Sequence, residues 1–350
     1  MQRTVTLIPD SLLPEIRGPC HECSLTNQPD RVRRAPPHTA ENWRVTKAWP
    51  GVSYDQWGAT CDTLHAHTQV LGKLSVALAP LEPELHHGAL RLTARGWETA
   101  PLPAPDGSGS LVVALDLHSH HVVVEHSDGQ SERVPLAPDR PVADVTNEVL
   151  AAVTRLGGHV RINPMPQEVP WGVPLDEDYE HTRYDPVQVA DYFAAVTQAA
   201  LALAEFSAPY RGRSTPVNAW WGSFDLAVTM YSGVPADPPG DGFITRNASD
   251  AEQIVVGWWP GDARHPDAAF YAFAFPSPAG FADATLSPAA ARWDENLGEF
   301  ILDWHDVRTA KNPRAAAVEF AHSAFRHAAL ACGWRTELLG STEGSPPPVR

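Results

Sequence analysis

The sequence predicts an α+β protein built mainly from antiparallel β-sheets with flanking helices. Helical patterns stand at the ends of each half of the chain, and runs of strand-like segments lie between them. Regular strand–helix alternation, which a doubly wound parallel sheet requires, is absent. The order of helix, strands and helix occurs in residues 47–170 and again in 180–335. We therefore expect two similar halves within one globular domain, residues 47–335.

The two ends of the chain differ from this body. Residues 1–46 are polar, with scattered proline and arginine and no sustained periodicity, so we expect a loosely ordered leader. Residues 336–350 contain the run SPPPVR and are expected to fray as a flexible tail.

The first half begins with a helix predicted over Tyr54–Leu78. Its apolar positions share one arc of the helical wheel: Trp57, Cys61, Leu64, Leu71, Leu74 and Leu78. His65, Gln69 and Lys73 form a separate polar stripe, which is typical of an exposed helix flank or of the border of a site. His67 falls inside the apolar arc and is expected to point toward the core.

The next segments alternate apolar and polar residues with the period of a β-strand. A strand at Leu90–Ala94 precedes a hairpin over residues 110–126, for which we expect a two-residue connection at Ser119-His120. A helix follows over Val142–Leu156 and ends at a pair of glycines. His159–Asn163 then has strand character.

The second half is bounded by two well-marked helices. Asp185 and Pro186 have the residue types of an N-cap and a first helical position, and the apolar run after them extends to Phe206. Asn312 and Pro313 start the last helix in the same way. Four strand candidates lie between these helices: Val217–Tyr231, Gln253–Trp259, Ala269–Phe275 and Phe300–Leu302.

The best candidate site lies in the segment Val217–Tyr231. As one continuous strand, this segment would place Trp221, Ser223 and Asp225 together on one face. The other face would be core and would carry Trp220, Phe224, Leu226, Val228 and Met230.

Neighbouring strands would add Trp259 and Tyr271 to the face that carries Asp225. Burial among aromatic rings raises the pKa of a carboxyl group, which suits a general acid or base or a clamp on a ligand amine. Asp225 is therefore the first candidate for proton transfer, and His65 is the second. The alternative is a solvated sheet face, or a buried aspartate satisfied by backbone amides.

Further side chains could bind a ligand at the border of this site. Gln69 and Lys73 belong to the polar stripe of the first helix, and Arg308 follows the last predicted strand. Together with Trp221, Ser223, Trp259 and Tyr271 they complete the predicted ligand-binding set.

We expect neither a metal nor a cofactor. His118 and His121, with Asp116 and Glu125, could approach a metal ion, but this pattern is more typical of the solvated face of a hairpin. The Cys20-x-x-Cys23 motif supplies only two thiolates, and a structural zinc needs four ligands. The sequence contains no HExxH, Walker A or GxGxxG motif.

Charge and composition limit the classes of partner that the protein can have. The chain has 26 Lys and Arg against 42 Asp and Glu, a net charge of −16, which would repel nucleic acids and anionic membranes. The apolar runs are short for a membrane span, and the N-terminus lacks a signal-peptide pattern. Four cysteines in 350 residues do not form a disulfide framework, so we expect a cytoplasmic protein.

Several long motifs resemble a bacterial family, the domain-of-unknown-function family 5996. The most specific are TLHAHTQVLGKL (Thr63–Leu74), PMPQEVP (Pro164–Pro170), WGSFDLAV (Trp221–Val228), AFYAFAFPSPAGF (Ala269–Phe281) and GEFILDWHDVR (Gly298–Arg308). The family carries no activity that could be transferred. It usually has Trp at His67 and His at Asn218, so an essential base at position 218 is in doubt here. The resemblance also implies that segments around several residues converge: His65, Arg95, His181, Asp225, Trp259, Tyr271 and Arg308.

Two function classes follow from these patterns. The first is a small-molecule site, either purely binding or part of a non-redox enzyme that carries out hydrolysis or isomerisation. The second is a noncatalytic interaction module that uses exposed Trp and Tyr side chains as anchors. A pocket of several hundred Å³ with converging polar groups would favour the first, and a flat exposed aromatic patch the second.

Overall fold

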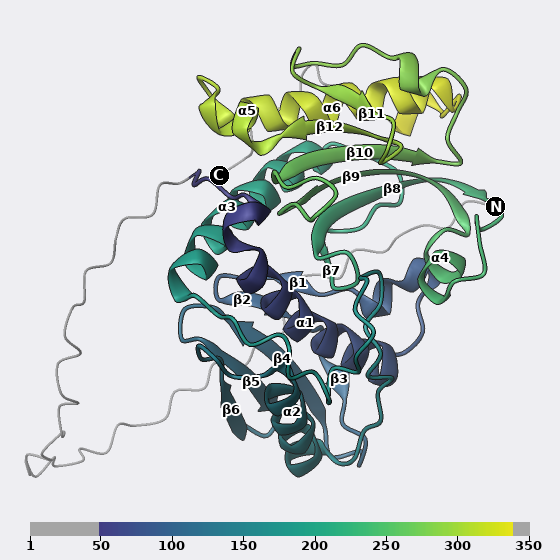
Figure 1. Cartoon of the computed structure of the whole chain (residues 1–350). Helices are drawn as coiled ribbons and strands as arrows, with labels where there is room; N and C mark the ends of the chain where they lie inside the picture. The colour runs from purple at the N-terminus through teal and green to yellow at the C-terminus, as the bar shows by residue number, and fades with distance from the viewer. Residues whose placement is uncertain (1–48, 339–350) are drawn as a thin grey trace, which may run out of the picture. The chain divides into compact units, whose positions relative to one another are not determined.

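The computed structural model describes residues 49–338, which fold into two antiparallel sheets of six strands each with helices packed against them (Figure 1). The α+β class with antiparallel sheets is therefore confirmed. The described residues all belong to one compact unit. The predicted leader, with Cys20 and Cys23, and nearly all of the predicted tail lie outside the described residues.

The first half runs from helix α1 to helix α2. The helices are α1 (Tyr54–Leu78), the short 3-10 turn η1 (Pro83–Gly88) and α2 (Val142–Gly157). The strands are β1 (Arg91–Leu92), β2 (Gly96–Glu98), β3 (Leu102–Pro103), β4 (Ser110–Asp116), β5 (His121–His126) and β6 (Ser131–Pro135). They pair in the order β1-β2-β4-β5-β6, and β3 also pairs with β4.

The second half runs from α3 to α6. Its helices are α3 (Pro186–Ser207), α4 (Phe243–Ala248), α5 (Trp304–Thr309) and α6 (Pro313–Ala331), with short 3-10 turns η2 (Phe281–Asp283) and η3 (Thr336–Leu338). Its strands are β7 (Asn218–Trp220), β8 (Asp225–Pro235), β9 (Ala251–Trp259), β10 (Ala269–Phe275), β11 (Arg292–Asp294) and β12 (Glu299–Asp303). They pair in the order β11-β12-β10-β9-β8-β7.

The predicted helix starts are confirmed at atomic detail. The Asp185 side chain accepts a hydrogen bond from the amide of Val187 at 2.8 Å, and Asn312 accepts one from the amide of Ala315 at 3.2 Å. Each side chain satisfies a donor that the first turn of a helix leaves without an intrahelical acceptor. The α1 helix has the predicted bounds, and His67 is buried as expected.

The two faces of the second sheet differ. On one face, Leu226, Val228 and Trp258 join a large apolar core to which α3 and α6 also contribute. The other face carries a smaller apolar cluster made of Ala227, Val255, Tyr271 and Ile301, flanked by Trp220, Trp259, Phe273 and Leu297. We call this second face the open face. The two sheets are joined where Leu90 and Ala219 exchange two backbone hydrogen bonds of 2.9 Å.

Two predictions in the first half are wrong. Residues 159–163 form no strand, because no described segment pairs with them and the prolines that follow have no amide hydrogen to donate. The connection between β4 and β5 has four residues, so Asp116, and not His118, pairs with His121. Asp116 accepts hydrogen bonds from the amides of His118 and Ser119, which turns the chain earlier than expected. The short elements β2, β3, β6, β11, α4 and α5 were not predicted.

Among the described residues, one helix passes a membrane-span test based on length and composition alone. This helix is α3, and such a match is weak support for a span because core helices of water-soluble proteins also pass. In this fold α3 packs against α6 and β8.

Candidate functional site

The segment predicted as one strand, Val217–Tyr231, is a hairpin. The β7 strand ends at Trp220, β8 begins at Asp225, and these two residues pair across the turn. The turn Trp221–Phe224 contains Phe224 at a φ of 59°. The predicted alternation therefore holds from Asp225 onward, but the four-residue turn moves Trp220, in place of Trp221, to the side of Asp225.

Trp221 is anchored in the core. Its side chain is 2% exposed, and its indole nitrogen donates a hydrogen bond of 2.9 Å to the carbonyl of Gly88. Its ring packs directly on α1 at Gly72, where any β-carbon would collide with it. Trp221 also lines the cavity described below, but its ring is held by core contacts that a ligand would not replace.

A cavity of about 870 Å³ lies over the open face of the second sheet. The sheet contributes Trp220, Asp225, Thr229, Tyr231, Trp259, Tyr271, Phe273 and Glu299 to its lining. Further walls come from α1, from η1, from the turn at residues 221–224, from residues 168–171, from α4 and the residue after it, and from residues 260–264 and 296–297. The cavity thus combines aromatic walls with a few polar groups, which is the usual composition of a small-molecule site.

Asp225 is the central polar group of this cavity. Its side chain is 5% exposed and accepts hydrogen bonds from the hydroxyl groups of Ser223 and Tyr271. Burial raises the pKa of the Asp225 carboxyl to about 6, and these hydrogen bonds partly oppose the shift. Tyr271 reaches Asp225 because its ring crosses β9 at Gly257, where a β-carbon would collide with it.

Of the other carboxyl groups that line the cavity, Glu168 and Glu299 are influenced by the charge of Asp225, and the sequence analysis did not identify them. Glu299 is half-buried and Glu168 is exposed as a whole residue, but desolvation of their carboxyl ends and the nearby charge of Asp225 raise the pKa of both to about 7. The Glu168 carboxylate lies against Gly222, where a β-carbon would collide with it. We call Asp225, Glu168 and Glu299 the carboxyl trio. Glu299 lies two residues before Ile301 on β12 and therefore shares its face, opposite Phe300 and Leu302, which was a usable signal. Glu168 lies in an irregular segment and gave none.

The polar stripe of α1 holds one wall of this cavity in place. His65, Gln69 and Lys73 are all buried, so the interpretation as an exposed flank is wrong. Gln69 donates a 2.9 Å hydrogen bond to the carbonyl of Gln167 and accepts one of the same length from its amide. Lys73 donates to the carbonyl of Met165 at 2.6 Å. The stripe therefore fixes the backbone of the segment that presents Glu168.

His65 fixes the hairpin turn. Its Nε2 atom lies 2.9 Å from the carbonyl oxygen of Trp221 and 3.0 Å from that of Gly222, so this nitrogen carries the hydrogen and donates it. Burial lowers the pKa of His65 to about 4, and the ring is neutral at pH 7. It stacks on Phe224 with 4.9 Å between ring centroids. This arrangement favours a positioning role for His65 over the predicted proton transfer.

Of the residues around which the family resemblance implied convergence, some do not line the cavity. Arg308 lies on α5 near Gly51 and does not line the cavity. Arg95 forms ion pairs of 2.8 Å with Glu98 and Glu125 on the first sheet. His181 is close to the site without lining the cavity, since it hydrogen-bonds to Asp178 at 2.6 Å and its ring packs on Trp171, 4.5 Å between centroids. Asn218 accepts a hydrogen bond from Arg91.

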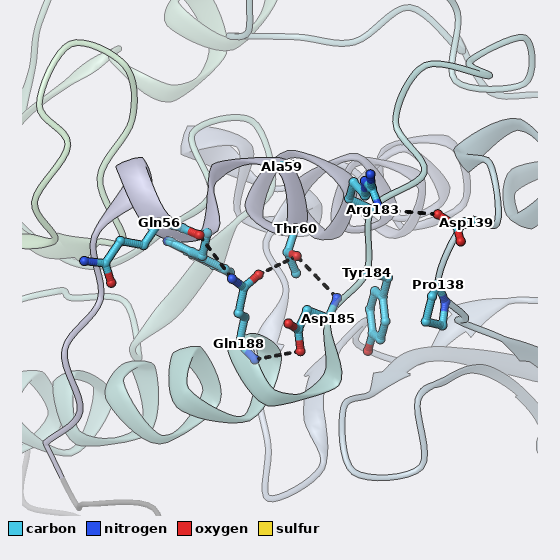
Figure 2. A pocket seen from close by; sticks show the side chains of 10 residues that line it. Gln56, Ala59, Thr60, Pro138, Asp139, Arg183, Tyr184, Asp185 and Gln188 are labelled. Carbon is cyan, nitrogen blue, oxygen red and sulfur yellow. Dashed lines mark hydrogen bonds and ion pairs between the residues drawn. The ribbon is translucent and has the colours of Figure 1, made fainter.

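A smaller cavity of about 290 Å³ lies where the N-terminal parts of α1 and α3 meet. Figure 2 shows that its polar side chains bind one another: the Thr60 hydroxyl donates to the Gln188 amide oxygen at 2.7 Å and accepts from the amide of Asp185 at 3.3 Å. Arg183 lies 3.6 Å from Asp139. These contacts join two helices and leave few free polar groups for a ligand.

Within residues 49–338, no three His, Cys, Asp or Glu side chains are placed to hold a metal ion together. His118 contacts the carbonyl of Ala94 and His121 that of Ser119, so these two rings are engaged separately.

Comparisons with known proteins place the chain in a family. No curated protein and no solved structure gives a match. A family model described as a family of unknown function (DUF5996) matches residues 49–341. This match covers most of the chain, and the chain therefore belongs to the DUF5996 family.

Proposed function

We propose that this chain binds a small organic molecule in the cavity over the open face, with Asp225 as its principal polar contact. The observation that carries the proposal is a buried carboxyl group, 5% exposed, in the wall of an 870 Å³ cavity lined by aromatic rings. Cavities of about 300–1,000 Å³ with apolar walls and a few converging polar groups are typical of small-molecule sites.

Asp225 also has the properties of a proton-transfer group. With a pKa of about 6, its carboxyl exists in both protonation forms near neutral pH. The hydroxyl groups of Ser223 and Tyr271 hold it in one orientation. A reaction in this cavity would accordingly be non-redox, a hydrolysis or an isomerisation in which Asp225 gives or takes the proton.

The competing function, a noncatalytic interaction module, has less support. Trp220, Trp259 and Tyr271 line a hollow, whereas an interaction surface would present such rings on a flat exposed patch. Among the described residues, the most exposed large apolar side chains are Leu81 and Tyr179, which come from separate segments.

The proposal is tested by looking for a retained ligand and by titration. Native mass spectrometry of the purified full chain should show a bound molecule that denaturation releases. Asp225→Asn should lose this molecule while its circular dichroism spectrum stays native, and Asp237→Asn, a change at an exposed residue after β8, should keep it. Phenylpropanol, a neutral aromatic probe, should also change the tryptophan fluorescence of the protein. A chain that retains nothing and responds to no aromatic probe would refute the proposed function.

A further inference from the structure

Resting on the proposed function, we propose that the ligand of this cavity is an organic cation, an amine or a quaternary ammonium group joined to an apolar body. The cationic group would lie among the carboxyl trio, and the apolar body would pack on the aromatic walls. The argument depends on how the charges around the cavity are balanced.

The cavity lining has an excess of negative charge. It contains six carboxyl groups, Asp62, Glu84, Glu168, Asp225, Asp262 and Glu299, against a single arginine, Arg264. His65 also lines the cavity, but its ring donates to two carbonyl groups and is neutral. The lining therefore contributes little positive charge of its own.

Three of the six carboxyl groups already have strong partners. Asp62 accepts hydrogen bonds of 3.0 and 2.9 Å from the hydroxyl group of Tyr54. Glu84 pairs with Arg213, and Asp262 pairs with Arg264 at 2.7 Å. The remaining three are the carboxyl trio.

No cation pairs with the carboxyl trio among the described residues. Asp225 is bonded to two hydroxyl groups and a backbone amide, and neither Glu168 nor Glu299 has a hydrogen-bond or ion-pair partner within residues 49–338. Arg264 acts on Glu299 at longer range and lowers its pKa in part, but its guanidinium is paired with Asp262. Carboxylates held close together without a counter-charge are unfavourable, and a ligand cation would relieve their repulsion. A neutral hydroxyl group could donate hydrogen bonds here, but it would leave the charges unbalanced.

The aromatic walls suit the same ligand. Trp259 and Tyr271 meet edge to face with centroids 5.7 Å apart, and Tyr271 stacks on Phe273 at 6.2 Å. Rings within about 6 Å of a cation attract it through their negative faces, and quaternary ammonium groups are commonly bound in this way. The rings also offer apolar area for the rest of the molecule, which an isolated inorganic ion could not use.

The geometry favours an organic cation over a metal ion. No three carboxyl, imidazole or thiol side chains in the described part of the chain are placed to hold one metal ion together. Divalent metals need several oxygen ligands at about 2–2.6 Å. Carboxyl groups spread around a wide cavity match a larger ligand, whose charge can be neutralised without direct coordination.

Three probes with one apolar body test the inference: phenylpropylamine, phenylpropanol and phenylpropanoate. Each is titrated into the full chain at about pH 8, with tryptophan fluorescence or calorimetry as readout. We expect the amine to bind about tenfold more tightly than the alcohol, as one added charge contact predicts, and the acid to bind more weakly than both. Benzyltrimethylammonium should bind like the amine, since it keeps the charge without an N–H donor.

Charge-removing variants locate the cation. Glu299→Gln should weaken the binding of the amine several-fold more than it weakens the binding of the alcohol. Glu295→Gln, in the β11–β12 connection just before Glu299 but outside the cavity lining, is the matched control and should change neither. Glu168→Gln should act like Glu299→Gln. If either cavity variant fails to fold, the native chain at about pH 5 provides the same comparison, because the trio is then largely protonated.

The outcomes separate this inference from the proposed function. If the alcohol or the acid binds as tightly as the amine, the cation inference is overturned and the small-molecule site remains. If none of the probes binds and no ligand is retained on purification, the proposed function fails, and the inference fails with it.

Discussion

Replacing Asp225 with asparagine should make the protein more stable at neutral and alkaline pH, although it removes the central group of the site. The pKa of Asp225 rises from 3.8 to about 6 on folding, because burial disfavours the charged form. The folded state therefore binds this proton more tightly than the unfolded state does. Stability is lost as the pH rises from about 4 to above 6, which is opposite to the usual behaviour of a carboxyl group in an ion pair.

The magnitude follows from the size of the shift. A shift of about two pKa units corresponds to about 3 kcal/mol at 1.36 kcal/mol per unit. Asparagine has the same shape but exchanges one accepting oxygen for a donor, so about 1 kcal/mol is lost in the hydrogen bonds to Ser223 and Tyr271. The free energy of unfolding of Asp225→Asn should thus be about 1 kcal/mol below that of the native chain at about pH 4 and about 2 kcal/mol above it at about pH 8.

Urea unfolding of both chains across this pH range measures the difference. Asp178→Asn is the matched control with the opposite sign. Burial acts to raise the pKa of Asp178, but hydrogen bonds from His181 and from the amide of Glu180 outweigh burial and leave the pKa lowered. The stabilising effect of Asp178 is therefore lost as the pH falls. A difference between Asp225→Asn and the native chain that stays constant with pH would mean that folding leaves the pKa of Asp225 unshifted. A difference that becomes more unfavourable at high pH would mean that the Asp225 carboxylate stabilises the fold.

Three further predictions concern the walls of the cavity. Gly257→Ala should lower the free energy of unfolding by about 1–3 kcal/mol because its β-carbon collides with both the Tyr271 ring and the carbonyl oxygen of Leu226. Gly172→Ala, with no atom nearby, should change the urea midpoint little. Gln69→Leu should leave the amide and the carbonyl of Gln167 unpaired, at a cost of about 1–3 kcal/mol each if they stay buried. Amide hydrogen exchange over residues 164–171 should then accelerate. An unchanged exchange rate would mean that Gln69 does not hold this segment in place. Affinity for phenylpropylamine should fall between about pH 8 and about pH 5 as the carboxyl trio, with pKa values of about 6 and 7, takes up protons, and a pH-independent calorimetric titration would contradict this.

Local signals in the sequence were sufficient to predict where the main helices begin and end. Asp185 and Asn312 cap their helices through bonds to amides two or three residues away, so the information lies within one turn. The α1 helix was equally clear from its apolar arc. The antiparallel arrangement followed from the order of these elements, since short connections between successive strands favour hairpins.

The turn at residues 221–224 could not be predicted in the same way. It lacks the Asn-Gly or Asp-Gly pair that marks a tight hairpin, and Phe224 adopts a positive φ that a bulky residue rarely takes. Phe224 is held there by distant residues: its ring stacks on those of His65, Trp97 and Tyr192 at 4.9–5.2 Å. The alternation of side chains between the two faces is therefore interrupted at this turn, whose position only tertiary contacts specify.

The buried polar stripe was missed for a related reason. Gln69 and Lys73 bind backbone groups of Gln167 and Met165, about 90 residues later in the chain. A helical wheel distinguishes polar from apolar faces, but it does not show that irregular backbone will cover the polar one. Glu168 was missed because it belongs to that irregular backbone.

The two faces of the second sheet place different demands on the sequence. Side chains that face α3 and α6 fill a continuous apolar core, where a change in volume is expected to cost stability. Those on the open face border a hollow, so a larger, smaller or differently charged side chain can be accommodated there at lower cost. Relatives built on this scaffold could diverge in what they recognise by exchanging residues such as Thr229 or Phe273, while the helix-facing half of every strand keeps the protein folded.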